Sequence, residues 1–206
     1  MPYRYLDIAS TPSVRAAQTE MGSDRLWSGR KFNRDFDRFR PAEMQFIAER
    51  DSLYMATVSE TGWPYVQHRG GPPGFLKVVD DRTLAFADYS GNRQYISLGN
   101  IAADKRAALI LMDYPRRARM KMYAHVDITA PDVSSTLTTL VTIAAYKAKI
   151  ERIFVLRLEA FDWNCPQHIT PRFTEAQIEE ASRPLRERIA QLEVENDTLR
   201  SRLNRT

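Results

Sequence analysis

The feature that most constrains the fold is a series of short strand patterns that begins after residue 50. Residues 53–58 and 63–69 have strand composition, and Glu60-Thr61-Gly62 between them is typical of a tight turn, so the two predict a hairpin. Further strands are predicted at residues 75–79, 83–87, 107–112, 120–128 and 153–161. Since few helices interrupt these strands, the pattern favours a closed antiparallel sheet over a parallel one. We expect a mainly β fold, a barrel of six or seven strands with peripheral helices.

The chain divides into three segments of different character. Residues 1–40 are polar with scattered aromatic residues, and they predict an N-terminal arm with one helix from about Pro12 to Met21. Residues 41–172 hold the barrel domain, including a helix that begins at about Gly91. Residues 173–206 predict a separate C-terminal helix.

Composition narrows the class of protein. The chain has 206 residues, of which 43% are hydrophobic and 27% charged, which excludes a mostly disordered chain. The single cysteine, Cys165, excludes an internal disulfide and a cysteine-built zinc site, and the three dispersed histidines predict no metal site. A net charge of +4 is too small to favour nucleic-acid binding. Because apolar runs are short and the N-terminus lacks a signal-peptide core, we expect a soluble, cytoplasmic protein.

The C-terminal helix has a heptad pattern of apolar residues. The d positions are Leu185, Leu192 and Leu199, and the a positions are Ile189, Asn196 and Leu203. One asparagine at an a position is typical of two-stranded coils, and the flanking charges agree with a parallel pair. In such a pair Arg188 at a g position faces Glu193 at an e position of the partner. Glu195 at the next g position likewise faces Arg200. The pattern favours a short coiled coil; the alternative is an amphipathic helix packed on the barrel.

Polar and cationic side chains gather near the second predicted strand. On this strand Tyr65, Gln67 and Arg69 point to one face. Arg69 precedes the loop Gly70-Gly71-Pro72-Pro73-Gly74, where glycines let a ligand approach the backbone, and Lys77 follows it. These residues predict a site that grips an anion.

A second candidate lies at the expected start of the helix after the fourth strand. Asn92, Arg93 and Gln94 would place an arginine beside the N–H groups of a first helical turn, which together form a phosphate cradle. The alternative interpretation is a set of surface cations with a helix cap.

A third candidate follows the last predicted strand. Trp163, Gln167 and His168 suit a flat heteroaromatic ligand, because they combine a stacking surface with hydrogen-bonding groups. Cys165 between them is either a small buried hydrophobe or a reactive thiol.

Together these motifs resemble a known family. The segments at residues 67–78, 86–88, 91–97 and 163–171 are similar to the flavin-nucleotide-binding proteins related to pyridoxamine 5'-phosphate oxidase, and the resemblance covers about Arg40 to Arg172. It implies a split β-barrel, a homodimer, and FMN bound at the dimer interface.

The resemblance also implies roles for individual residues. The cofactor-binding set is Gln67, Arg69, Lys77, Asn92, Arg93, Gln94, Trp163, Gln167 and His168. Within it Arg69 and Lys77 match phosphate-side residues, whereas Trp163 and Gln167 or His168 would reach the ring system from the second subunit.

The chain departs from the true oxidases at three places. The glycine- and proline-rich loop separates Arg69 from Lys77, Gln94 stands where the family has a lysine, and residues 163–168 replace a tryptophan-to-arginine motif. These departures indicate a substrate other than pyridoxamine phosphate.

We therefore expect an FMN-dependent oxidoreductase of unknown substrate, in which the flavin carries the hydride or electrons. The alternative is a flavin-binding storage or sensor module without turnover. No residue is assigned as catalytic; Tyr65 and His168 are candidates for an acid or base.

Overall fold

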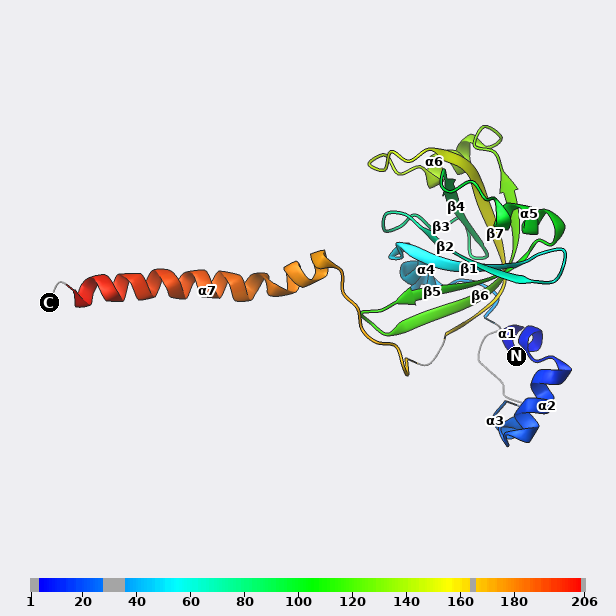
Figure 1. Cartoon of the computed structure of the whole chain (residues 1–206), viewed down its shortest axis with the longest axis horizontal. Helices are drawn as coiled ribbons and strands as arrows, with labels where there is room; N and C mark the ends of the chain where they lie inside the picture. The colour runs from blue at the N-terminus through cyan, green and yellow to red at the C-terminus, as the bar shows by residue number, and fades with distance from the viewer. Residues whose placement is uncertain (1–3, 28–35, 164–165, 205–206) are drawn as a thin grey trace. The chain divides into compact units, whose positions relative to one another are not determined.

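The strands form one antiparallel sheet. A computed structural model describes residues 4–27, 36–163 and 166–204, and within these ranges the sheet has seven strands in the order β2-β1-β5-β6-β7-β4-β3 (Figure 1). The strands are β1 Ser52–Val58, β2 Pro64–Gly70, β3 Lys77–Val78, β4 Thr83–Tyr89, β5 Arg106–Asp113, β6 Ala118–Thr129 and β7 Ile150–Trp163. Strands β2 and β3 are the edges, so the barrel is split between them. The predicted mainly β fold is confirmed.

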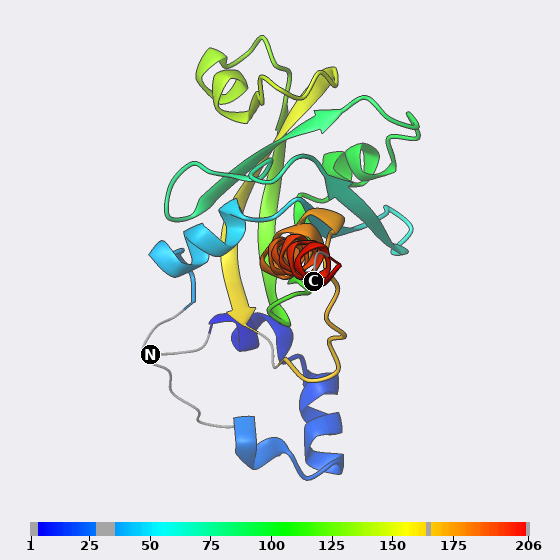
Figure 2. The same cartoon turned by 90° about the vertical axis from the view of Figure 1, so that its left-hand side faces the viewer.

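The described residues also form seven helices. They are α1 Arg4–Ala9, α2 Pro12–Glu20, α3 Asp24–Trp27, α4 Pro41–Ala48, α5 Ile96–Ala103, α6 Ser135–Val141 and α7 Glu175–Leu203. Helix α4 contacts β3, α5 contacts β1 and β6, and α6 contacts β4 and β7 (Figures 1 and 2). Helix α2 confirms the helix predicted in the arm, with the Thr11 hydroxyl accepting a hydrogen bond from the Val14 amide at 3.4 Å.

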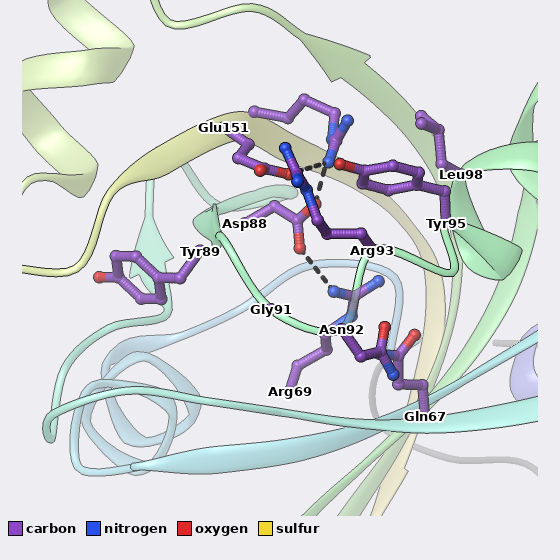
Figure 3. Close-up of a pocket in the computed structure, with 11 residues that line it drawn as sticks. Gln67, Arg69, Asp88, Tyr89, Gly91, Asn92, Arg93, Tyr95, Leu98 and Glu151 are labelled. Atoms are coloured by element: carbon purple, nitrogen blue, oxygen red, sulfur yellow. Dashed lines mark hydrogen bonds and ion pairs between the residues drawn. The ribbon is translucent and has the colours of Figure 1, made fainter.

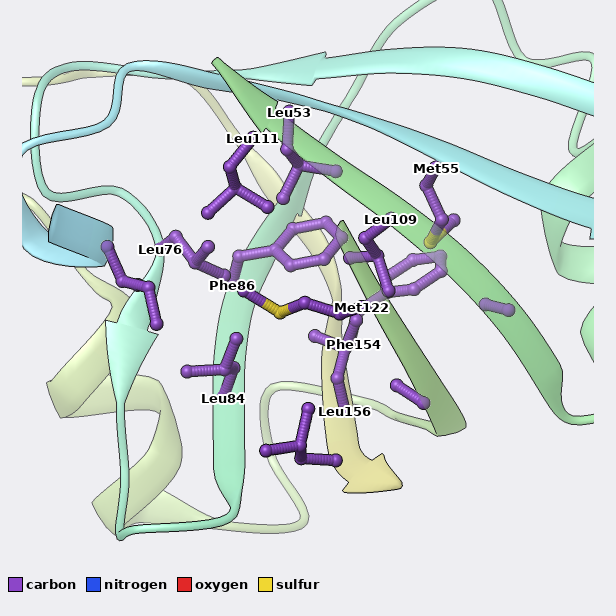
Figure 4. Packing of buried hydrophobic residues seen from close by; sticks show 14 of the residues in the cluster. Leu53, Met55, Leu76, Leu84, Phe86, Leu109, Leu111, Met122, Phe154 and Leu156 are labelled. Carbon is purple, nitrogen blue, oxygen red and sulfur yellow. The ribbon is translucent and has the colours of Figure 1, made fainter. Parts of the chain in front are cut away.

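The barrel interior is filled by alternate residues of the strands. In β5, for example, Ala107, Leu109 and Leu111 are buried while the residues between them are half-buried. Figure 4 shows side chains of several strands meeting in one cluster, in which Phe86 and Phe154 stack with their ring centres 5.0 Å apart. This interdigitated packing is what stabilises the sheet.

A buried ion pair lies at one margin of this core. Arg50 donates to the Asp113 carboxylate at 2.8 Å, and both side chains are under 10% exposed. The same guanidinium donates to the carbonyl oxygens of Phe46 and Met112. The pair thus ties the end of α4 to the end of β5, and its buried charges are compensated.

The first helix of the arm docks on the outside of the barrel. Tyr5 of α1 is buried and stacks on Tyr123 of β6, with ring centres 4.8 Å apart. Burial raises the pKa of the Tyr5 hydroxyl, and Tyr123 raises it further. Arg4 forms an ion pair with Glu159 at 2.7 Å. Helix α1 is therefore held by both apolar and polar contacts.

Two local details differ from the expectation. Strand β3 has only two residues, because the Phe75 amide donates to the Pro72 carbonyl at 2.9 Å in a turn and does not join the sheet. Helix α5 begins at Ile96 rather than at about Gly91. The Asn92 side chain instead accepts a hydrogen bond from the Gln94 amide at 3.1 Å, a local turn that competes with the helix.

The chain forms two compact units. One comprises Met1–Asp113 and Ala118–Gln167, and the other comprises Tyr114–Arg117 and His168–Thr206. The second unit contains α7, whose first turn has a capping box between Thr174 and Gln177 and in which no residue is buried. None of the described helices is long and apolar enough to cross a membrane.

Candidate functional site

A cavity of about 160 Å³ opens where the second, fourth and seventh strands approach the loop before α5 (Figure 3). Its polar and aromatic lining comprises Gln67, Arg69, Asp88, Tyr89, Asn92, Arg93, Tyr95, Glu151 and Arg152. The lining therefore combines three elements that are far apart in the sequence.

Strand β2 contributes two side chains from its inner face. Gln67 accepts a hydrogen bond from the Ser97 hydroxyl of α5 at 3.1 Å. Arg69 donates through Nη1 to one oxygen of Asp88 at 2.5 Å, and Arg152 donates to the other oxygen at 3.1 Å. Asp88 therefore holds both guanidinium groups in place, and Figure 3 shows its bond to Arg69 as a dashed line.

Arg69 has a buried hydrogen-bond donor without a partner. Its side chain is 15% exposed, and the donor is its Nε atom. Burial lowers the pKa of this guanidinium, while Asp88 acts in the opposite direction. Since a buried donor without a partner costs roughly 1–3 kcal/mol, an acceptor that reached this atom would be stabilised there.

The loop before α5 is held in an unusual backbone conformation. Arg93 and Tyr95 both adopt left-handed φ values, of 61° and 53°. Such residues cost about 1–3 kcal/mol each and concentrate at functional sites. A register shift between Asp88 and Tyr89 also interrupts the pairing of β4 with β7 beside the cavity. The local distortions thus coincide with the cavity.

The charges that line the cavity do not cancel. Three arginines, Arg69, Arg93 and Arg152, contribute to it. The carboxylates are Asp88 and Glu151, and the pKa of Glu151 is lowered by hydrogen bonding to Ser90 and by the nearby Arg152. One positive charge remains, which suits an anionic ligand.

The size of the cavity limits what it can enclose. Pockets that enclose a drug-sized ligand measure roughly 300–1,000 Å³. About 160 Å³ therefore has room for a phosphate and a short polar chain, but not for a three-ring flavin. The unpaired Nε of Arg69 and the excess positive charge fit the phosphate end of FMN, and its ring system would lie outside this cavity.

The structure brings together four of the residues predicted to bind the cofactor. Gln67, Arg69, Asn92 and Arg93 line the cavity, although the last two belong to a loop and not to a helical first turn. Gln94 is exposed in the same loop, and Lys77 lies half-buried on β3; neither lines the cavity. Their cofactor roles stay predictions.

The residues predicted to reach the ring system lie elsewhere. Trp163 ends β7, eleven residues from Arg152, so the two are separated by up to about 36 Å along the strand. The indole Nε1 donates to Glu43 at 3.1 Å, and the ring packs edge-on against Phe46. Trp163 could therefore serve a flavin only in the site of a partner subunit, as the resemblance implies.

The other candidates near the end of β7 are placed as follows. Gln167 is exposed, and His168 belongs to the second unit, exposed and with a left-handed φ of 62°. Cys165 lies outside the described residues. Tyr65 is half-buried on the same face of β2 as Gln67.

Sequence reasoning missed the residues that complete the cavity. Arg152 stands opposite Asp88 in the pairing of β4 with β7, and Glu151 precedes it. Tyr95 lies 4.6 Å from the Arg152 guanidinium. Since no local motif marks Glu151 and Arg152, only the pairing of two strands 60 residues apart reveals them. Within the described ranges no cluster of three or more acidic, histidine or cysteine residues could hold a metal ion.

Solved structures of similar topology have low sequence identity to the chain. A protein from Clostridium acetobutylicum related to general stress protein 26, of the pyridoxinephosphate oxidase family, is 10% identical with a TM-score of 0.45, covering 66% of this chain and 94% of that one. An FMN-binding protein from Syntrophomonas wolfei is 12% identical with a TM-score of 0.42, covering 74% and 95%. An F420 reductase is 23% identical with a TM-score of 0.41, covering 60% and 98%.

Sequence comparison is more decisive. A search of curated proteins finds no match. The family model described as pyridoxamine 5'-phosphate oxidase, however, matches residues 39–158, more than half of the chain. This match confirms the resemblance drawn from the sequence motifs: the chain belongs to the pyridoxamine 5'-phosphate oxidase family.

Proposed function

We propose that this protein binds FMN, with the phosphate in the Arg69 cavity, and acts as an oxidoreductase at the interface of a homodimer. The observation that carries the proposal is the buried, unpartnered Nε of Arg69, a residue that lines a cavity of excess positive charge. A phosphate oxygen would accept the hydrogen bond that the protein itself leaves unmade.

Arg93 would supply the second cationic contact. It is exposed on the loop whose backbone is left-handed at two positions, so its side chain is free to close over a bound anion. Charge-assisted hydrogen bonds of this kind are shorter and stronger than neutral ones. Arg69 would thus bind the phosphate from strand β2, and Arg93 would bind it from the solvent side.

The limited volume of the cavity favours a second subunit as the wall for the flavin ring. The outer face of the β1–β2 hairpin is apolar and exposed: Tyr54, Val58 and Val66 lie on it, and Trp63 at the turn is 76% exposed. Contiguous exposed apolar patches mark interaction surfaces. We assign this face to a second copy of the chain, which would also supply Trp163 to the ring.

Bound FMN supplies hydride or electron transfer, while the residues of this chain bind and orient it. The substrate proposed is not pyridoxamine phosphate, because Gln94 replaces a family lysine and the C-terminal motif of the oxidases is absent. The photoreduced protein should be reoxidised faster by a true electron acceptor than by buffer alone. A bound flavin that no acceptor reoxidises would instead indicate a storage or sensor module.

The cofactor is tested by absorbance. Purified protein, or protein incubated with FMN and passed over a desalting column, should show flavin absorbance and release FMN rather than FAD on denaturation. Protein that stays colourless after this treatment would refute FMN binding.

The phosphate contact is tested by comparing FMN with riboflavin, which lacks the phosphate. Arg93→Asn removes the charge, and asparagine tolerates the left-handed backbone. FMN affinity should fall about 10- to 150-fold, which corresponds to the roughly 1.5–3 kcal/mol of a charged hydrogen bond, and riboflavin affinity should barely change. Arg106→Asn, an exposed arginine that pairs with Asp104, is the control. Equal losses for both ligands would mean that Arg93 acts on the fold.

A further inference from the structure

We propose that α7 pairs with α7 of a second copy of the chain as a parallel, two-stranded coiled coil. The inference goes beyond the proposed function, because α7 lies outside the family match at residues 39–158 and the pairing requires no flavin. It rests on the exposure of the helix, on one polar residue in its seam and on the order of its charges.

The apolar stripe of α7 is not buried within its own unit. Its five apolar seam residues, Leu185, Ile189, Leu192, Leu199 and Leu203, are between 45% and 74% exposed. No residue of the helix is buried. In proteins most helical stability comes from packing of an apolar face, so a stripe of this kind stabilises the helix only when it is packed.

The proline within the helix does not obstruct the seam. Pro184 occupies a c position, on the side opposite a and d, and Leu185 to Leu203 continue beyond it as about 28 Å of helix. Five of the six a and d positions in this stretch are apolar. The sixth, Asn196, would face Asn196 of the second copy and bond to it, which specifies two strands in register.

The charges beside the seam agree with the parallel orientation. In that orientation Arg188 lies beside Glu193 of the second copy. Glu195 likewise lies beside Arg200 of the second copy. Among the described residues Glu193, Glu195 and Arg200 form no ion pair within their own chain, so they are available for these contacts.

The antiparallel orientation is opposed by the same residues. With the two seams fully overlapped, Arg188 approaches Arg202 of the second copy and Glu195 approaches its own counterpart, so like charges meet. Asn196 would face Leu192, which leaves its amide unpaired in the seam.

An antiparallel pair in which one helix is shifted by one heptad is also disfavoured. The charges would then match, but Ser182 would face Leu199 and Asn196 would face Leu185, so both polar residues would oppose leucines in the seam. Each buried polar group without a partner is costly. The sequence of α7 thus selects one orientation by disfavouring the others.

A parallel coil constrains where the two barrels lie. It places the first turns of the two α7 helices side by side, and Thr174 is only seven positions after Gln167, a reach of at most about 25 Å. Both barrels must therefore lie at the same end of the coil. Such a tether raises the effective concentration of one barrel near the other.

Disulfide trapping in the full-length chain tests the orientation. In a Cys165→Ser background, Leu199→Cys should form a disulfide-linked dimer under mild oxidation, because position 199 faces itself only in the parallel coil. Thr198→Cys, one residue away on the outer side, is the matched control and should remain largely unlinked. A Leu199→Cys chain that links only to an Ile189→Cys chain would show an antiparallel coil and overturn the proposal, as would a chain that links no faster than the control.

Charge exchange provides an independent test that does not depend on the barrel. In the Leu199→Cys background, one variant carries Glu193→Arg and Glu195→Arg, and the other carries Arg188→Glu and Arg200→Glu. Each repels itself, whereas the mixture matches all four pairs, so linked heterodimers should exceed either homodimer by about tenfold. A random mixture of linked species would mean that these charges do not face each other.

Discussion

The barrel and α7 contain similar apolar residues, but the barrel buries them and α7 exposes them. In the barrel Leu111 and Phe154 are fully buried, whereas in α7 Leu185 and Leu199 are more than half exposed. The strands of the barrel are stabilised by the core that they build together. Helix α7 instead has a strong local signal, a capping box at Thr174, and none of its residues is buried. Local propensity alone can thus define a helix whose stability depends on a partner.

The two regions differ in their ion pairs as well. Arg50 and Asp113 are 9% and 5% exposed, whereas Arg183 and Glu180 on α7 are 61% and 66% exposed. Buried charges depend on each other because neither can be hydrated. Exposed charges are hydrated with or without a partner, so the same chemistry has different consequences in the two regions.

The largest expected effect is the loss of a core aromatic. Phe154→Ala removes a ring that stacks on Phe86 and should lower the free energy of unfolding by about 3–5 kcal/mol. Leu199→Ala is the control in α7 and should leave the barrel transition unchanged. Tryptophan fluorescence in denaturant reports this transition, because α7 contains no tryptophan. Equal shifts for the two variants would show that α7 unfolds together with the barrel.

Removing one carboxylate of the buried pair should be nearly as severe. Asp113→Asn removes the buried carboxylate and leaves Arg50 only the more exposed Glu49 at 3.3 Å, and we expect a loss of about 3 kcal/mol in the free energy of unfolding. Glu180→Gln, the matching change in α7, should cost less than about 0.5 kcal/mol. Chemical denaturation of both variants measures the difference. If the two changes cost the same, burial does not govern these pairs.

Helix α1 gives a smaller effect that depends on pH. Tyr5→Phe should cost about 1 kcal/mol at neutral pH, because a buried hydroxyl loses its interaction with Tyr123. The pKa of Tyr5 is raised in the folded chain, so above about pH 10 the unfolded chain releases this proton first and stability falls as pH rises. The variant lacks this proton and should lose less stability between pH 9 and about pH 11. Parallel pH profiles would contradict the burial of Tyr5.

Truncation after Thr174 should have the smallest effect on the barrel itself. At high protein concentration the barrel should unfold within about 1 kcal/mol of the full chain, since α7 contributes no buried residue. The proposed dimer of the truncated chain should nevertheless be weaker, so it should dissociate at higher protein concentrations than the dimer of the full chain does. Sedimentation of both proteins, with flavin absorbance followed across the boundary, measures this. A flavin-free monomer after truncation would identify α7 as the main dimer contact.

Much of the fold could be predicted because its signals are local. The alternation of Leu53 to Val58, the turn at Gly62 and the heptads of α7 each arise from neighbouring residues. The prediction was wrong at the start of α5, where the Asn92 side chain forms a turn that helix-start signals do not distinguish from a cap. It also overestimated β3, because the Phe75 amide bonds to Pro72 in a turn instead of joining the sheet.

The candidate site could be predicted only in part. Arg69 and Arg93 stand in motifs that mark them as cationic contacts, and both line the cavity. Asp88 and Arg152, which hold Arg69 in place, are brought together by strand pairing across more than 60 residues. No local pattern encodes that register.

The sequence by itself therefore determined the strands, the helical tail with its heptads, the family, and Arg69 and Arg93 as cations of the site. Only the tertiary structure decided that Arg152 joins them, that the Arg69 Nε is buried without a partner, and that no residue of α7 is buried. The physical reason is the sequence separation over which each kind of interaction acts. Periodicity and capping act between residues a few positions apart, whereas burial and strand register depend on contacts between distant segments that form only when the whole barrel is packed.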